Sequence, residues 1–169
     1  MKTIVIDKYF YNSHKKDFFF FMPVIYDLLS DLECEYPNFG KWLLRVFEEI
    51  SKGERSILLK LYNEQVVAIS IIKHTKHEEK ISTFRVLSKY KGLGIGTELM
   101  EDSFYYLRND SPLITVSEKR INEFIPFLSK LKFEETEKIQ SCYLKNITEY
   151  IFNGLLEKEE IPKHFYFYQ

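Results

Sequence analysis

The sequence predicts a single domain of the α/β (α+β) class, in which helices and strands alternate along the chain. The chain has 169 residues, which is the length of one ordinary domain. It is 45% hydrophobic and 17% aromatic, so it can build a sizeable core. Segments with helical spacing of apolar residues alternate with β-branched runs. We therefore expect one domain over residues 1–154, followed by a C-terminal extension over 155–169.

The N-terminal third reads as one short strand and two helices. Residues 3–6 are β-branched and form the expected first strand. Apolar residues recur at helical spacing from Asp17, a candidate cap, to about residue 35. A second helical pattern covers residues 39–52, and Gly53 is placed to end it.

Three strands are expected next. Residues 56–62 and 66–73 are rich in β-branched and aliphatic side chains, and the polar residues 63–65 between them indicate a hairpin turn. Residues 74–80 form a charged turn, and 81–86 form the next strand. This order predicts a β-meander.

Three glycines follow the meander and point to an anion site. Gly92, Gly94 and Gly96 lie between the strand 81–86 and a helical pattern over 97–108, next to Lys89 and Lys91. Glycine lets the backbone turn its N–H groups toward an anion at close range. A helix N-terminus adds partial positive charge. The segment therefore predicts a phosphate-binding loop.

Two common phosphate loops fit this spacing poorly. No glycine is followed by Lys and then Ser or Thr, so the P-loop pattern is absent. A dinucleotide-binding loop needs a third glycine where Thr97 stands. Glu118 could mimic the ribose-binding acid of that fold, so a nucleotide-binding domain remains a weaker alternative.

The C-terminal part predicts a strand, a helix and a hairpin. Residues 113–116 are a short apolar strand, and Asn122 can cap a helix that ends near residue 132, with Pro126 in or near its first turn. Residues 133–144 and 148–152 suggest a final hairpin. The tail over 155–169 carries an aromatic run that is suited to packing on the domain or on a partner.

The glycine loop resembles the acetyl-CoA pyrophosphate loop of the GNAT superfamily of N-acetyltransferases, whose pattern is R/Q-x-x-G-x-G/A. Lys91 replaces the usual Arg or Gln and keeps the charge without the planar fork. The later helix resembles the family's A-x-x-F-Y-x-K-x-G-F segment, with Leu128 in place of Tyr and Lys132 in place of Gly. The matching residues are Tyr90, Gly92, Gly94, Gly96, Phe127, Lys130 and Phe133.

The resemblance covers roughly residues 37–154 and extends to the order of the elements. It implies a GNAT fold: a central mixed, mostly antiparallel twisted sheet of about six or seven strands with a splayed parallel pair, flanked by about four helices. It also implies acetyl-CoA as cosubstrate. The residues expected to bind it are Phe84, Arg85, Val86, Lys91, Gly92, Leu93, Gly94, Ile95, Gly96, Thr97, Asn122, Phe127 and Lys130.

The resemblance further implies direct attack of a primary amine on the thioester in a ternary complex. Glu79 is the candidate base, although the register that we use places Lys80 at the expected position, one residue further on, and neighbouring residues of a strand face opposite sides. Leu128 stands where the family often has its acid, so Ser117 and Tyr143 are the candidate replacements. The acceptor would be an amine on a small molecule, peptide or protein. The alternative is a catalytically degenerate module that binds CoA and acts through protein contacts.

Composition limits which other partners, such as nucleic acids, membranes and metals, are expected. The net charge of −1 gives no reason to expect nucleic-acid binding, and no apolar run approaches the roughly 20 residues of a membrane span. Cys34 and Cys142 form neither a disulfide framework nor a metal motif and are expected to fill the core in a reducing cytoplasm. We expect no metal, and the chain is compatible with a homodimer.

Overall fold

The computed structural model describes residues 1–36 and 38–156 and divides the chain into two compact units. The first unit comprises Met1–Glu33 and Asn38–Pro112, and the second comprises the short segment that begins at Cys34 together with the chain from Leu113 onward. The tail expected over 155–169 lies outside the described residues beyond Leu156. The expectation of a single domain over 1–154 stays a prediction, and each unit is treated by itself.

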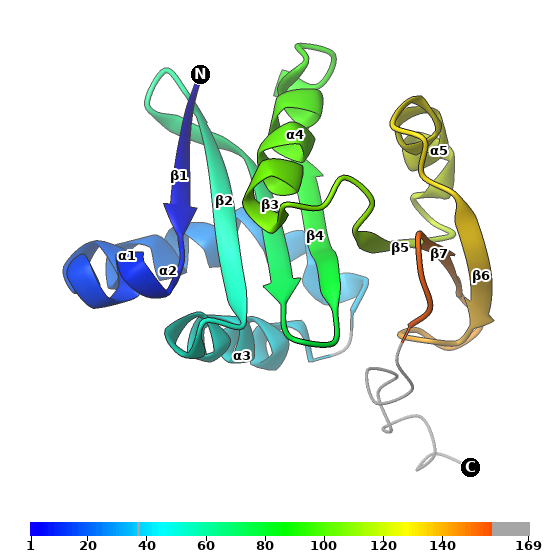
Figure 1. The fold of residues 1–169 in the computed structure, drawn as a ribbon, viewed down its shortest axis with the longest axis horizontal. Coiled ribbons are helices and arrows are strands. Elements are labelled where there is room, and N and C mark those ends of the chain that lie inside the picture. The colour runs from blue at the N-terminus through cyan, green and yellow to red at the C-terminus, as the bar shows by residue number, and fades with distance from the viewer. Residues whose placement is uncertain (37, 157–169) are drawn as a thin grey trace. The chain divides into compact units, whose positions relative to one another are not determined.

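A four-stranded antiparallel sheet forms the centre of the first unit. Its strands are β1 (Lys2–Ile6), β2 (Arg55–Tyr62), β3 (Gln65–His74) and β4 (Glu79–Val86), and they lie side by side in that order. The aliphatic residues of β2 and β3 are almost all buried because helices cover both faces, with α2 behind the sheet and α4 in front of it in Figure 1. The expected β-meander is present, with β4 beginning at Glu79 rather than residue 81.

The hairpin between β2 and β3 closes in two residues rather than the three expected. Tyr62 pairs with Gln65, and both intervening residues have positive φ, 49° at Asn63 and 63° at Glu64. This is the pattern of a type I′ turn, whose backbone twist matches that of the flanking strands. Glycine is the usual residue at the second position of this turn, so the backbone of Glu64 is held in a strained conformation.

The helices of the first unit are α1 (Lys8–Ser13), α2 (Lys15–Leu29), α3 (Phe39–Lys52) and α4 (Ile95–Leu107), with the 3₁₀ turn η2 (Ser88–Tyr90). The 3₁₀ turn η1 (Ser30–Cys34) belongs to this unit except for its last residue, Cys34. Helix α1 was not expected from the sequence. The expected cap Asp17 is wrong, because α2 begins at Lys15 after His14, and α4 begins at Ile95 rather than Thr97.

The second unit contains a three-stranded antiparallel sheet and one helix. Strands β5 (Leu113–Ser117), β7 (Thr148–Phe152) and β6 (Glu135–Gln140) pair in that order, and α5 spans Ile121–Lys130. Leu113, Cys142, Ile151 and Leu156 form its buried cluster. Cys142 therefore fills a core as expected, whereas Cys34 is exposed and that expectation was wrong.

Three boundaries in the second unit differ from the prediction. Helix α5 is capped by Arg120 rather than Asn122, which places Pro126 inside the helix, beyond its first turn. Strand β6 ends at Gln140, because Ser141 adopts a φ of 58° and leaves the extended conformation. Tyr143 therefore lies in the loop between β6 and β7, not on a strand.

Candidate functional site

The glycine loop joins the end of β4 to the start of α4. Lys91, Gly92, Leu93 and Gly94 are all exposed. Gly92 and Gly94 both have a φ of 79°, a backbone conformation that favours glycine. A Cβ atom added at either position would meet nothing within 4 Å. The space above both glycines is therefore open for a ligand to approach the backbone.

The N-terminus of α4 supplies the donors that an anion needs. Gly94 is the N-cap, and no side chain caps the helix. Glu98 is the first residue whose N–H reaches back to Gly94, at 3.1 Å. The N–H groups of Ile95, Gly96 and Thr97 precede it and have no carbonyl within the helix to bind. Their orientation and the helix dipole suit a pyrophosphate.

The hairpin tip of β2 and β3 supports the residue that precedes the loop. The hydroxyl of Tyr90 donates to Gln65 Oε1 at 3.1 Å, and the rings of Tyr90 and Tyr62 meet edge to face at 5.9 Å between centroids. The Nζ atom of Lys89 lies 4.8 Å from the centre of the Tyr90 ring. These contacts fix the start of the loop without using its glycines.

A buried lysine holds α4 against the sheet. The Nζ atom of Lys60 on β2 lies 2.7 Å from Asp102 Oδ2 and 3.3 Å from Glu98 Oε2, and its side chain is only 5% exposed. Thr3 donates to the same Asp102 oxygen at 2.6 Å. Burial alone would raise the pKa of Asp102, but the hydrogen bonds from Lys60 and Thr3 and the Lys60 charge outweigh it and lower that pKa.

Alternate residues of β4 direct their backbone groups away from β3. The N–H of Leu87 donates to the carbonyl of Val67 at 2.9 Å, and Val86 pairs with Ala68. Hydrogen-bonded and non-hydrogen-bonded positions alternate along an antiparallel pair. The backbone groups of Phe84 and Val86 therefore point away from β3 and are directed toward the other edge of β4.

The backbone and side chain of Arg85 face other partners than those of Phe84 and Val86. By the same alternation its backbone groups face β3. Its guanidinium forms a two-pronged ion pair with Asp31 of η1, with Nη2 and Oδ2 2.6 Å apart. The side chain thus ties η1 to β4, and any contact of Arg85 with a cofactor would have to compete with this pair.

A β-bulge bends β4 near its middle. Ile71 pairs with Thr83 but Ile72 pairs with Ile81, which leaves Ser82 as the extra residue. Arg55 Nη1 donates to Ser82 Oγ at 2.8 Å and thereby fixes the bulge. Bulges often re-aim groups next to active sites, and this one lies between the candidate base Glu79 and the cofactor contacts at Phe84 and Val86.

The candidate base Glu79 lies at the far end of β4 from the glycine loop. It is exposed, and its Oε2 accepts a hydrogen bond from Asn109 Nδ2 at 2.6 Å. Val86 lies seven positions further along the strand, which corresponds to about 24 Å in an extended chain. Its neighbour Glu78 is buried and lies 2.7 Å from Lys73 Nζ.

In the second unit, the catalytic candidate Ser117 lies opposite a buried carboxylate. Ser117, the last residue of β5, pairs across the sheet with Glu149 of β7. Ser117 is 4% exposed and Glu149 is 1% exposed. Within the described residues the Ser117 hydroxyl has no hydrogen-bond partner, which is costly for a buried polar group unless a ligand satisfies it.

Two tyrosines accompany this carboxylate. The rings of Tyr36 and Tyr143 meet at 6.0 Å between centroids. Burial raises the pKa of the Tyr36 phenol well above its ordinary value, and the charge of Glu149 raises it further. Glu35, next to Tyr36, forms an ion pair with Arg120 at 2.5 Å and anchors this segment to α5. Tyr36, Tyr143, Ser117 and Glu149 are called the tyrosine–carboxylate cluster below.

The remaining predicted cofactor contacts lie on α5. Asn122 is exposed in the first turn, Phe127 is half-buried, and Lys130 is exposed at the last helical position. Leu128, which replaces the family's tyrosine, is 1% exposed and lies in the core.

Sequence reasoning missed Glu149. Period-two alternation along β7 puts it on the same face as Ile151, and both are buried. A glutamate on the apolar face of a strand was therefore the signal that could have revealed it.

The described residues contain no grouping of three or more His, Cys, Asp or Glu side chains that could hold a metal ion. Within the same ranges, no helix has the length and apolar character needed to cross a membrane.

Comparison with known proteins was made by sequence and by structure. No protein-family model and no curated protein sequence matches the chain. Similarity to solved structures is extensive. The ribosomal-protein-alanine N-acetyltransferase of Brucella melitensis has a TM-score of 0.66 and 15% identity, covering 92% of this chain and 100% of that one.

Two further structures extend the likeness. An acetyltransferase of Bacillus subtilis in complex with CoA has a TM-score of 0.58 and 13% identity, covering 77% of this chain and 93% of that one. A GNAT-family acetyltransferase of Elizabethkingia anophelis with acetyl-CoA bound has a TM-score of 0.53 and 14% identity, covering 73% and 87%. The chain therefore has the GNAT fold, which confirms the expected fold class.

Proposed function

We propose that this protein is an acetyl-CoA-dependent N-acetyltransferase that acetylates a primary amine by direct attack in a ternary complex. The observation that carries the proposal is the open glycine loop at the start of α4. Two glycines at positive φ, open space above them and the uncapped first turn of α4 together make a site suited to a pyrophosphate. The solved structures that share the fold and hold CoA or acetyl-CoA support this assignment.

The residues that would hold acetyl-CoA follow from this geometry. The N–H groups from Gly92 to Thr97 would bind the pyrophosphate, with Lys91 nearby as an exposed cation. The outward backbone groups of Phe84 and Val86 would hydrogen-bond the pantetheine arm. Asn122, Phe127 and Lys130 remain proposals for further contacts, with Lys130 directed at the 3′-phosphate.

The reaction itself needs little beyond positioning. The amine nitrogen attacks the thioester carbonyl carbon, a C–N bond forms, the C–S bond breaks, and CoA leaves as a thiolate. An N–H near Val86 would stabilise the developing oxyanion. The amine must give up a proton. The departing thiolate can take up a proton, but because a thiol has a pKa of about 8.5, the thiolate needs little help from an acid.

We propose that the tyrosine–carboxylate cluster of the second unit binds the acceptor amine. A buried carboxylate near Tyr36, whose ring contacts that of Tyr143, suits an ammonium group, which is attracted both by charge and by the faces of aromatic rings. Ser117, whose hydroxyl has no hydrogen-bond partner among the described residues, and Tyr143 remain the proposed acids. We propose Glu149 as the base, because it is buried opposite Ser117, whereas Glu79 is exposed.

An assay for acetyl transfer tests the proposal. CoA release from acetyl-CoA is measured with a panel of amines: peptides with a free α-amine, the same peptides with a blocked N-terminus and a free lysine, and small polyamines. We expect turnover with at least one class and at least tenfold slower turnover in Glu149→Gln. Glu135→Gln, a partly exposed carboxylate on β6, is the matched control and should behave like the wild type.

The second candidate function is a CoA-binding module without catalysis. The burial of Leu128 favours it, because no phenol can act from that position. Saturable acetyl-CoA binding without turnover of any amine in the panel would support this reading over the first.

A further inference from the structure

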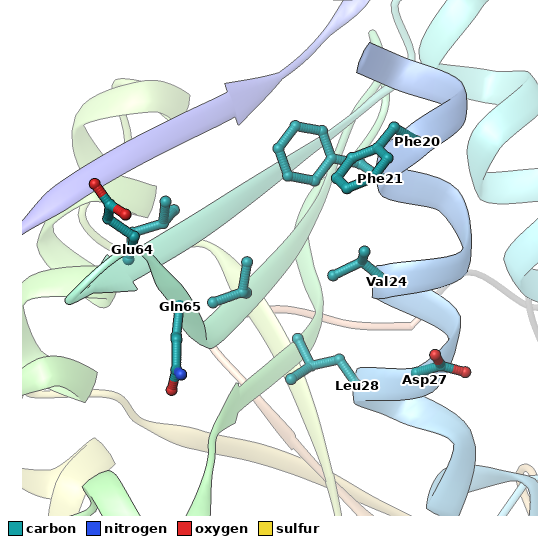
Figure 2. A pocket seen from close by; sticks show the side chains of 9 residues that line it. Phe20, Phe21, Val24, Asp27, Leu28, Glu64 and Gln65 are labelled. Carbon is teal, nitrogen blue, oxygen red and sulfur yellow. The ribbon is translucent and has the colours of Figure 1, made fainter. Parts of the chain in front are cut away.

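A groove in the first unit lies outside the glycine loop and the tyrosine–carboxylate cluster. It lies between α2 and the β2–β3 hairpin and has a volume of about 540 Å³. Figure 2 shows Phe21, Val24 and Leu28 between the helix and the strands, with Glu64 and Gln65 on the opposite wall. Small-molecule sites commonly have volumes of 300–1,000 Å³, roughly, and mostly apolar walls.

The groove is lined mainly by apolar side chains, with one carboxylate at the edge of each wall. Six of its nine lining residues are apolar, and the charged ones are Asp27 and Glu64. Among the residues that the structure describes, no lysine, arginine or histidine lines the groove. Among residues 1–36 and 38–156 neither carboxylate takes part in an ion pair. Phe20, one of its two phenylalanines, is 68% exposed despite its size.

We propose that this groove binds a small organic cation with an apolar or aromatic body. The apolar walls would bury the body of the ligand, and Asp27 and Glu64 would attract its charge. The rings of Phe20 and Phe21 add favourable faces for a cation. An anion of the same shape would meet two like charges, and a neutral molecule would gain only the apolar contacts.

This site is independent of the proposed acetyl transfer. No group of the glycine loop or the tyrosine–carboxylate cluster lines the groove. A ligand of the groove therefore does not have to be an amine that can be acetylated. One wall does contact the loop support, since Gln65 accepts the hydrogen bond from Tyr90. A quaternary ammonium compound cannot be acetylated, so its binding separates this groove from an acceptor site.

The strained hairpin makes a sharp pair of variants possible. Glu64 occupies a turn position with a φ of 63°, where glycine is preferred, and Asn63 beside it has a φ of 49°. Glu64→Gly removes the carboxylate while relieving backbone strain, so the protein should be no less stable than the wild type. Asn63→Gly changes the neighbouring position of the same turn, which also accepts glycine, and leaves both carboxylates in place.

The experiment titrates the full chain with (3-phenylpropyl)trimethylammonium and follows the backbone amide signals by NMR. We expect saturable shifts at Val24, Leu28 and Val66, and at least tenfold weaker binding of 4-phenylbutanol and 4-phenylbutyrate. The double variant Asp27→Asn, Glu64→Gly should lose at least tenfold in affinity for the cation, whereas Asn63→Gly should lose less than twofold. Absence of saturation, shifts elsewhere only, equal binding of the neutral compound, or an unchanged affinity in the double variant would each overturn the proposal.

Discussion

Replacing Gly94 by alanine should weaken acetyl-CoA binding more than it weakens the fold. Gly94 has a φ of 79°, and an added methyl group would meet no atom of the protein within 4 Å. The cost to folding is therefore the backbone penalty alone, which is roughly 1–2 kcal/mol for a non-glycine residue in this region. A ligand seated over the loop would collide with the methyl group.

Gly53 provides the matched control. It has a φ of 82° at the end of α3, and a methyl group there would meet only the flexible side chain of Lys8, at 3.2 Å. Gly53→Ala should therefore lose a similar free energy of unfolding, roughly 1–2 kcal/mol, and keep its acetyl-CoA affinity.

The assay combines urea denaturation with calorimetric titration of acetyl-CoA for the wild type and both variants. We expect equal losses of stability within about 1 kcal/mol, and at least a tenfold rise in Kd for Gly94→Ala alone, which corresponds to about 1.4 kcal/mol. Equal affinities in all three proteins would refute the placement of the pyrophosphate over Gly94. Equal losses of affinity in both variants would show that the effect comes through folding.

Three further predictions concern the frame and the chemistry. Burial lowers the pKa of His74, so the unfolded chain binds more protons than the folded one as the pH drops through 6.5. The free energy of unfolding should therefore fall over this range, by no more than about 1.4 kcal/mol per pH unit. Urea titrations at several pH values should show a shallower fall in His74→Gln. Lys60→Met should cost roughly 1–3 kcal/mol in urea denaturation because it leaves a charged network without its buried cation, whereas Lys52→Met, which breaks an exposed pair with Glu48, should stay within about 0.5 kcal/mol; equal losses would contradict the role given to Lys60. Tyr36→Phe should raise KM for the amine in steady-state acetylation assays and leave KM for acetyl-CoA unchanged, and a change in the second value alone would remove Tyr36 from the acceptor end.

Periodicity was enough to predict most of the first sheet. The aliphatic runs of β2 and β3 and the polar turn between them placed both strands within a residue or two. Residues 8–13 carried no such signal, because a six-residue helix shows less than two turns of apolar repeat. Its cap, the Asp7 side chain accepting from the N–H of Phe10 at 2.8 Å, is visible only once the chain is folded.

Helix ends were the weakest part of the prediction. The apolar repeat continues past Leu29, but α2 ends there and the 3₁₀ turn η1 follows, in which Asp31 forms an ion pair with Arg85. An ion pair between residues so far apart in the chain cannot be read from the local sequence pattern that predicts a helix. Pro126 was expected near the start of its helix because proline disfavours interior positions, yet α5 begins at Ile121 and accommodates it.

The conformation of the glycine loop was predictable from the sequence, and the tyrosine–carboxylate cluster was not. Glycine spacing is local, and the structure gives Gly92 and Gly94 the positive φ that the spacing implied. The tyrosine–carboxylate cluster depends on the pairing of β5 with β7, which joins Ser117 to a residue more than thirty positions away. No short-range pattern encodes that pairing, and only the alternation along β7 hinted at Glu149.

Calorimetric titration of the wild-type protein with acetyl-CoA, with NAD and ATP as controls, tests the central claim most directly. The account predicts saturable binding of acetyl-CoA at one site per chain and no saturable response to either control. Absence of acetyl-CoA binding, or equal binding of NAD or ATP, would contradict the assignment of the glycine loop to the CoA pyrophosphate.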